Sequence, residues 1–118
     1  MIEHIDERNF YDIIKHNDVV LVDFTSKYCA PCKLQERELV NIDRQFGNKI
    51  KIISVEISRS PKLASKFGIV ATPTLMFFKK GKKVRFTSRS QGTIDRFIGL
   101  RQARQLVGPI NFLLNMKV

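Results

Sequence analysis

One stretch of this chain, from Val19 to Phe46, most narrowly constrains how the chain can fold. Its first part, Val19 to Phe24, is a run of β-branched and aromatic residues that predicts a strand buried on both faces, with Asp23 as the single charge. The two cysteines of the chain, Cys29 and Cys32, follow this strand. A helical pattern then runs to Phe46, and we expect its inward face to hold Leu34, Leu39, Val40, Ile42 and Phe46.

The position of the cysteines predicts reactive sulfur chemistry. Pro31 suits the first turn of a helix, where its missing N–H would have no partner, so Cys29 is expected at the helix N-terminus. The unpaired N–H groups and the dipole there favour a negative charge such as a thiolate. Cys32 follows about one turn later on the same face, within reach of a disulfide to Cys29. In a reducing compartment, such a Cys-x-x-Cys pair is catalytic or metal-binding more often than structural.

The flanking segments predict alternating helices and strands. Asp6 is a suitable cap for a helix through about Lys15. Residues 50–57 form a second strand, expected to lie parallel to the first because a helix joins the two. A short helix opens with Ser60 and Pro61 and ends at Gly68.

The last third of the chain predicts a hairpin and a final helix. Strands over 75–78 and 84–87 would flank a turn at 80–82. The helix is expected from about Thr93 until Gly108 and Pro109 stop it. This interpretation gives one domain over 1–107 and an apolar extension over 108–118, which packs on the domain or serves for docking.

Charge is unevenly distributed along the chain. The net charge is +10, but residues 59–118 hold 13 of the 21 basic and one of the 11 acidic residues, which leaves residues 1–58 slightly acidic. The asymmetry indicates an acidic partner or surface, or else only a soluble basic face. A nucleic acid is not expected, because the basic cluster over 79–85 lacks interleaved surface aromatics and any binding motif.

Residues 1–7 are acidic and carry no apolar run, and no stretch is long and apolar enough for a membrane span, so we expect a cytoplasmic protein. His4 and His16 have no cysteine or acidic cluster at metal-ligand spacing, and we interpret both as surface residues. No metal site is expected.

Three motifs in order carry a family resemblance: Leu-Val-Asp-Phe at 21–24, Tyr-Cys-Ala-Pro-Cys-Lys at 28–33, and Thr-Pro-Thr-Leu at 72–75. In this order and spacing they resemble the thioredoxin family over roughly residues 1–107. The resemblance implies the α/β thioredoxin fold, a central mixed sheet of four or five strands flanked by helices. It also implies a cis peptide bond before Pro73, facing the sulfurs.

The resemblance further implies a thiol-disulfide oxidoreductase that reduces disulfides in partner proteins and needs no cofactor beyond its Cys29–Cys32 disulfide. Cys29 would attack, Cys32 would resolve the mixed disulfide, and buried Asp23 would accept a proton. A thioredoxin reductase or an equivalent dithiol donor would reduce the protein again. The expected substrate-binding residues are Tyr28, Ala30, Pro31, Thr72, Pro73 and Arg89.

Several positions depart from the family pattern. The chain has no tryptophan, Tyr28 and Thr25 stand where the family usually has one, and Ala30 replaces a glycine. Other departures concern the surroundings of Asp23, the long helix and the substrate groove of the family. They are Ser54 where many relatives have a lysine beside the buried acid, Arg37 where a proline kinks the helix, and Ser90, Gln91 or Gly92 for the groove glycine.

The residues leave alternative functions open. A redox-switched binding module with a basic surface would also use the cysteine pair, as would a disulfide oxidant or isomerase. The neutral dipeptide of Ala30 and Pro31 lacks a charge that would strongly stabilise the thiolate, which favours a reductant. A metal site using both thiolates would show only two of the usual four ligands.

Overall fold

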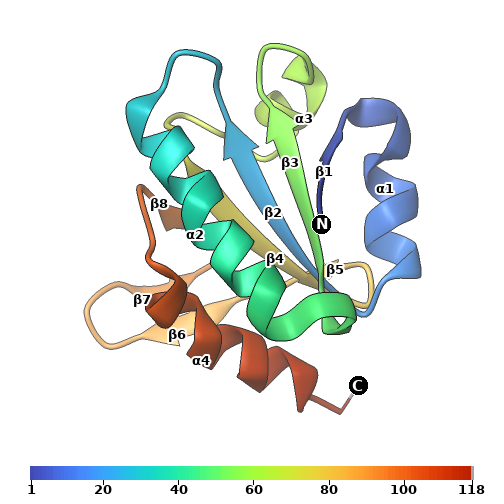
Figure 1. The fold of residues 1–118 in the computed structure, drawn as a ribbon, viewed down its shortest axis with the longest axis vertical. Coiled ribbons are helices and arrows are strands. Elements are labelled where there is room, and N and C mark those ends of the chain that lie inside the picture. The colour runs from blue at the N-terminus through green and yellow to red at the C-terminus, as the bar shows by residue number, and fades with distance from the viewer. Residues whose placement is uncertain (118) are drawn as a thin grey trace.

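The computed structural model describes residues 1–117, which form a mixed sheet between two layers of helices (Figure 1). The sheet has six strands. Five follow one another across the sheet, in the order β1 (Ile2–Ile5), β3 (Lys51–Glu56), β2 (Val19–Thr25), β4 (Thr74–Lys79) and β5 (Lys82–Lys83). The sixth, β8 (Phe97–Ile98), also pairs with β4. The expected mixed sheet is confirmed, but it has six strands rather than four or five, because the two short strands β5 and β8 both pair along the outer edge of β4.

Strand β2 is the centre of the sheet and lies parallel to β3 but antiparallel to β4. The parallel pairing that we expected from the intervening helix is therefore confirmed. Strand β1, which the sequence analysis did not predict, adds to the far side of β3 in parallel register. Because three parallel strands end at the same edge, the loops that follow them gather at one rim of the molecule (Figure 1).

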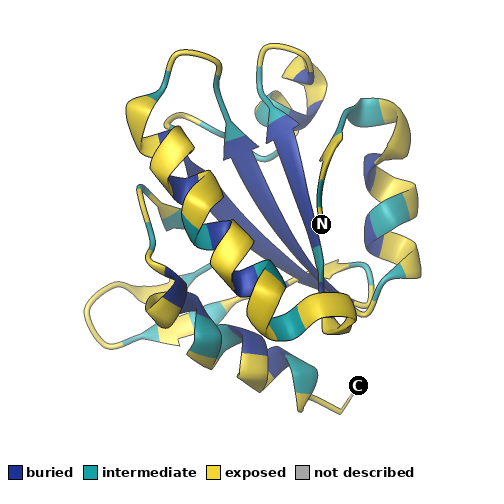
Figure 2. Cartoon of the chain, viewed as in Figure 1, coloured by how far each residue is buried: buried dark blue, intermediate teal, exposed yellow. Residues whose placement is uncertain are grey.

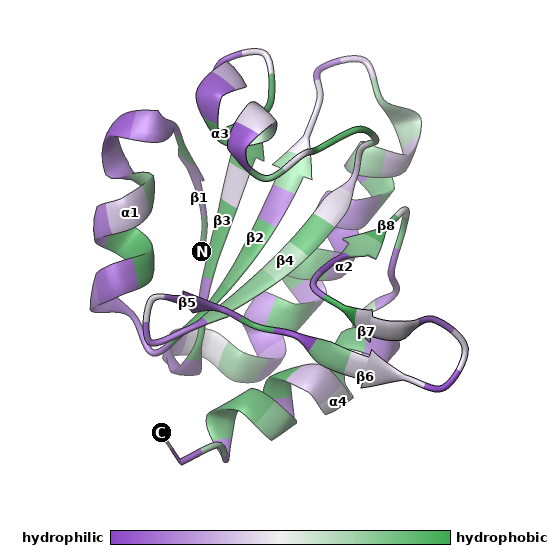
Figure 3. Cartoon of the chain, turned by 180° about the vertical axis from the view of Figure 1, so that it is seen from behind, coloured by the Kyte–Doolittle hydropathy of each residue, from purple (hydrophilic) through white to green (hydrophobic). Residues whose placement is uncertain are grey.

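The helices cover both faces of the sheet. Helices α2 (Ala30–Phe46) and α4 (Ala103–Leu114) lie on one face, and α1 (Glu7–His16) and α3 (Pro61–Lys66) lie on the other, as Figures 1 and 3 show from opposite sides. A 3₁₀ turn, η1 (Gly47–Lys49), follows α2. None of the helices in the described part of the chain combines the length and the apolar character that crossing a membrane requires.

Burial is strongest in the central strands, as Figure 2 shows. Alternate residues of β2 point to opposite faces, so Val19 and Leu21 join the core under α2 and α4, whereas Val20 and Val22 join the core under α1 and α3. Asp23 has the parity of Val19 and Leu21, which places its carboxyl group on the α2 side of the sheet.

The inward face of α2 differs from the predicted one at two positions. Leu34 and Val40 are 48% and 37% exposed, and the buried residues are Cys32, Gln35, Leu39 and Ile42. The prediction failed because it chose the face by apolar residues alone: the buried positions follow a helical spacing of three to four residues that includes polar Gln35, and Leu34 and Val40 lie beside this stripe. Cys32 and Gln35 then continue the same stripe as Leu39.

The chain after β4 departs most from the prediction. The return strand expected over 84–87 is wrong: the strand that pairs with β4 is β5, which consists of Lys82 and Lys83. Beyond it, the Val84 N–H donates to Phe77 O at 2.9 Å. The chain then leaves the sheet in a small hairpin, β6 (Phe86–Ser88) and β7 (Gly92–Ile94), and rejoins β4 as β8. We call residues 84–96 the edge excursion. The helix predicted from Thr93 is wrong, since this residue lies in β7.

Helix α4 starts at Ala103 and continues through Gly108 and Pro109, so the predicted stop at these residues is also wrong. Pro109 lies inside the helix, and Ile110 and Leu113 beyond it are fully buried in the core under α2. The expected boundary between 107 and 108 therefore falls within one helix, whose far end packs on the sheet. Position 118 of the expected extension lies outside the described residues.

Candidate active site

Cys29 and Cys32 form a disulfide at the start of α2, where we expected the sulfurs to meet. Cys29 is the N-cap of the helix, and the N–H of Cys32 donates to Cys29 Sγ at 3.2 Å, so the sulfur occupies the position that a capping oxygen would normally fill. Cys29 is partly exposed and Cys32 is 4% exposed. The arrangement gives one sulfur access to a partner and shields the other.

Thr72 and Pro73 lie against the accessible sulfur, and the peptide bond between them is cis, as expected from the resemblance. Both the carbonyl oxygen and the hydroxyl oxygen of Thr72 are 3.6 Å from Cys29 Sγ. The hydroxyl group also shares a hydrogen bond of 2.7 Å with Ser26 Oγ. In the reduced protein this hydroxyl can donate to a Cys29 thiolate, and Ser26, which sequence reasoning missed, helps to orient it.

Asp23 is the buried acid of the site. Its side chain is 3% exposed, and Oδ1 has no hydrogen-bond partner among the described residues. Burial raises the pKa of Asp23 to about 7, and the negative charge of Glu36 adds to the shift. Its register partner on β3 is Ser54, and the partner of Ser54 on β1 is His4. A group with such a pKa can exchange a proton near neutral pH.

Gly99 is the residue that sequence reasoning missed at the groove. Its N–H donates to Pro73 O at 2.8 Å, and its φ of +89° suits glycine better than other residues. The three candidates for this position, at 90–92, lie instead around the tip of the β6–β7 hairpin. The signal was the pair Phe97 and Ile98 before Gly99, a β-strand pattern that the predicted helix had absorbed.

A buried side chain of α2 fixes the segment that follows Gly99. Gln35 is fully buried, its amide donates to Arg101 O at 2.9 Å, and its oxygen accepts from the Arg101 N–H at 2.8 Å. Glu38 accepts from the Ala103 N–H at 2.8 Å, at the start of α4. Nothing in the sequence distinguished Gln35 from the polar residues on the outer face of the helix.

The other expected substrate-binding residues divide into two groups. Tyr28 is 93% exposed directly before Cys29, and Ala30 and Pro31 are exposed in the first turn of α2, so all three border the disulfide. Arg89 lies in the turn of the β6–β7 hairpin, which projects away from the start of α2 (Figure 1). The structure does not bring Arg89 to the sulfurs.

The site contains no cluster that resembles a metal centre. Within residues 1–117, no three histidine, cysteine or acidic side chains gather where they could hold one ion. The functional groups at the disulfide are thus two sulfurs, hydroxyl groups, backbone amides and one buried carboxyl group.

Comparisons with known proteins agree on one family. The sequence model of the family described as Thioredoxin matches residues 1–106. A thioredoxin from Rickettsia bellii is 30% identical over 112 residues, which cover 94% of this chain and 97% of that protein. Thioredoxin 1 from a Nostoc species is 38% identical over 81 residues, which cover 68% of this chain and 76% of the relative.

Solved structures show the same fold. A thioredoxin from Halobacterium salinarum superposes with a TM-score of 0.81 at 22% identity, over 99% of this chain and 94% of the other. Chloroplastic thioredoxin z superposes with a TM-score of 0.78 at 21% identity, over 95% of this chain and 93% of the other.

Proposed function

Because this chain belongs to the thioredoxin family and is a thiol-disulfide oxidoreductase, we propose that Cys29 attacks, Cys32 resolves and Asp23 carries the proton. The observation that carries the proposal is the placement of the Cys29 sulfur at the cap of α2, with the Cys32 N–H 3.2 Å away. After reduction, the same N–H and the helix dipole stabilise a thiolate on Cys29.

The reaction transfers two electrons from the dithiol to the partner. The Cys29 thiolate attacks one sulfur of the partner disulfide, the partner S–S bond breaks, and the leaving partner thiolate takes up a proton. Cys32 then gives its proton to the Asp23 carboxylate and attacks Cys29 Sγ. The mixed disulfide breaks, the Cys29–Cys32 disulfide forms, and the second partner sulfur leaves as a thiolate, which takes up a proton as Asp23 returns its proton to the solvent.

Substrate recognition would use the rim around the disulfide. The backbone of Thr72 lies next to the sulfur, with its carbonyl oxygen 3.6 Å from Cys29 Sγ, directly before the cis peptide bond to Pro73, and we propose that it pairs with the main chain of a partner. Three exposed apolar residues lie near the site in the chain: Tyr28 directly before Cys29, Val70 two residues before Thr72, and Leu100 directly after Gly99. Their exposed fractions are 93%, 88% and 37%. They offer a tolerant surface for varied partners.

The donor of electrons and the compartment are part of the proposal. The family acts on disulfide-containing proteins and is reduced by thioredoxin reductase, and we propose the same donor class for this chain, in the cytoplasm. The proposal predicts that a NADPH-dependent thioredoxin reductase reduces the Cys29–Cys32 disulfide. Failure of that reduction, with turnover by a small dithiol preserved, would replace the donor and leave the activity in place.

The activity is tested by turnover of a model protein disulfide with a small thiol as donor. The wild-type chain is expected to accelerate reduction, and Cys29→Ser to have no more activity than buffer. The matched variant Cys32→Ser should instead trap a covalent mixed disulfide with the substrate, visible by mass spectrometry. A Cys29→Ser variant as active as the wild-type chain would contradict the proposal.

A further inference from the structure

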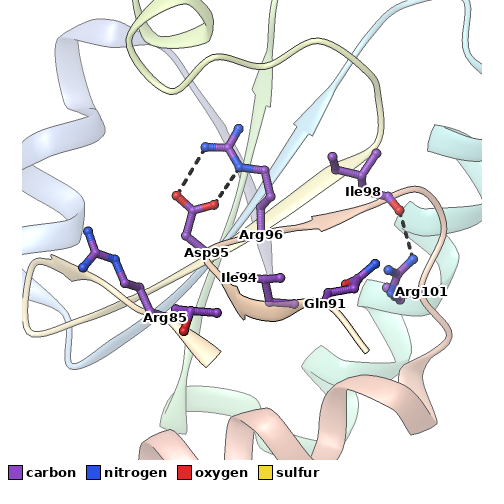
Figure 4. Close-up of a pocket in the computed structure, with 8 residues that line it drawn as sticks. Arg85, Gln91, Ile94, Asp95, Arg96, Ile98 and Arg101 are labelled. Atoms are coloured by element: carbon purple, nitrogen blue, oxygen red, sulfur yellow. Dashed lines mark hydrogen bonds and ion pairs between the residues drawn. The ribbon is translucent and has the colours of Figure 1, made fainter. Parts of the chain in front are cut away.

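A pocket of about 560 Å³ is lined by residues of the edge excursion together with Ile98 and Arg101 (Figure 4). It is formed by β7, by β8 and by the segments next to them. Its lining is basic, with an apolar part from Ile94 and Ile98 and polar groups from Gln91 and Thr93. The charged residues of the lining are Arg85, Asp95, Arg96 and Arg101.

Backbone contacts connect one side of the pocket to the segment around Pro73. Ile98, one of its lining residues, is the register partner of Thr74, which directly follows Pro73. Gly99 then binds Pro73 O through its N–H at 2.8 Å. Arg96 reaches the loop before Thr72, because its guanidinium donates to Gly68 O at 3.3 Å. A partner chain seated against Thr72 would therefore pass the mouth of the pocket.

The charge of the pocket is not balanced by the protein. Asp95 is the one carboxylate of its lining and is held by Arg96 at 2.8 Å and by Lys83 at 2.9 Å. These contacts lower the pKa of Asp95, with the hydrogen bond from Arg96 as the largest cause. The negative charge of Asp95 is therefore already paired with Arg96 and Lys83 and does not neutralise the other arginines. The Arg101 guanidinium donates to the backbone oxygens of Ile98 and Leu100 and lies 5.6 Å from the Phe97 ring centroid. Neither this guanidinium nor that of Arg85 has an acidic partner among the described residues.

We propose that this pocket binds an acidic segment of the disulfide-containing partner, with carboxylates at Arg85 and Arg101. The inference rests on the proposed function, because its occupant is the same polypeptide whose disulfide reaches Cys29. Arginine suits the task, since its planar guanidinium pairs with carboxylates through two parallel hydrogen bonds. The apolar wall formed by Ile94 and Ile98 accommodates the methylene groups of glutamate.

A nucleic acid fits the pocket less well than a peptide does. Phe86 and Phe97, the aromatic residues nearest the lining in the chain, are partly buried and pack against the core and each other, with ring centroids 5.6 Å apart. The Arg101 guanidinium also lies 5.6 Å from the Phe97 ring centroid, so the two rings are engaged within the protein rather than set out as a platform for base stacking, a usual component of single-strand binding. The pocket also holds a few side chains rather than a continuous basic track.

The test compares two disulfide-bonded peptides that are identical except for glutamates or glutamines a few residues from the disulfide. With a small thiol as donor, the wild-type chain should reduce the glutamate peptide with a higher kcat/KM, by about fivefold to tenfold for two exposed ion pairs. Arg85→Gln should reduce the ratio of the kcat/KM for the glutamate peptide to that for the glutamine peptide. Arg85→Glu should lower the ratio below one and should favour a third peptide with lysines at the same positions. Use of the ratio within each variant cancels any general loss of activity.

Arg44→Gln serves as the matched control. Arg44 lies on α2 outside this pocket, and its substitution removes the same charge as Arg85→Gln does. It should keep the wild-type ratio. The proposal is overturned if Arg85→Gln retains the preference, or if Arg44→Gln loses it equally, which would indicate only a general field. Displacement of the glutamate peptide by a single-stranded oligonucleotide, without a preference between the two peptides, would overturn it in favour of nucleic acid. Absence of turnover with both peptides would instead reject the proposed function.

Discussion

Asp23 on β2 and Ser54 on β3 are register partners, and the hydroxyl side chain leaves the buried carboxyl group without a neighbouring cation on that strand. No ion pair to Asp23 exists among residues 1–117, and one carboxyl oxygen lacks any hydrogen bond. Burial therefore acts on this group almost without compensation, which is why its pKa rises to about 7.

The stability of the folded chain should depend on the protonation of Asp23. The pKa of Asp23 is about 7 in the folded chain and 3.8 in its reference state, so between these values the folded chain holds a proton that the unfolded chain has released. The free energy of unfolding should fall by about 4 kcal/mol as pH rises through this window. Asp23→Asn should abolish the fall, as measured by denaturant unfolding of the oxidised protein. An unchanged pH profile would contradict the assignment, and Asp12→Asn, at an exposed site, is the control.

A cation at position 54 should partly reverse the shift. Ser54→Lys places an ammonium group opposite Asp23 and is expected to lower the pKa of the carboxyl group by about 1–3 units. Ser54→Ala removes the hydroxyl without adding charge and should leave the pKa high. Carboxyl NMR titration measures both variants, and equal values in the two would show that the register contact does not control the acid.

The hydroxyl of Thr72 should stabilise the Cys29 thiolate. Thr72→Val keeps the shape and removes the donor 3.6 Å from the sulfur, so the pKa of the Cys29 thiol should rise by up to about one unit in the reduced protein. Thr74→Val is the matched control, since the Thr74 hydroxyl donates to Ala71 O instead. The pH dependence of thiol alkylation reports the pKa. A shift of equal size in both variants would mean that the hydroxyl contact is unimportant.

Gln35 should be important for stability as well as position. Gln35→Leu leaves the N–H and the C=O of Arg101 unpaired in a buried place, and we expect a loss of about 2–4 kcal/mol in the free energy of unfolding. The same change at exposed Gln45 should alter it by less than about 0.5 kcal/mol. Equal effects at the two positions would contradict the role of these hydrogen bonds.

The end of α4 should behave as core. Ile110 is fully buried, so Ile110→Ala should cost about 2–5 kcal/mol, whereas Phe112→Ala, at a side chain that is 59% exposed, should have little effect. Denaturant unfolding measures both. If Ile110→Ala were as mild as Phe112→Ala, residues beyond 107 would act as an appendage to the domain.

The reactive centre could be predicted from sequence because its signals are local. The apolar run before the cysteines, the proline in the first helical turn and the Thr-Pro pair each depend on neighbours a few residues away. The structure places Cys29, Cys32 and Thr72 together as expected. Asp23 was found for a related reason, since a carboxylate within an apolar strand has nowhere to lie except in the core.

The helix and strand predictions for the last third of the chain were wrong because tertiary packing outweighs local preference there. A proline inside a helix costs about 3 kcal/mol, which argues for a stop at Pro109. Burial of Ile110 and Leu113 contributes about 1.5–3 kcal/mol each and offsets that cost, so α4 continues. Gln35 and Gly99 escaped prediction similarly, since their partners, Arg101 and Pro73, are 66 and 26 residues away along the chain.

The edge excursion leaves β4 after Lys83 and returns to the same side of the same strand at Phe97. The register of β2, β3 and β4 does not depend on the path taken between these two residues. Val84 and Phe86 anchor the start of this loop in the core, whereas residues 89–93 are exposed. Evolution can accordingly change the length and sequence of that exposed tip, and with it the choice of partner, without altering the strands that hold the disulfide.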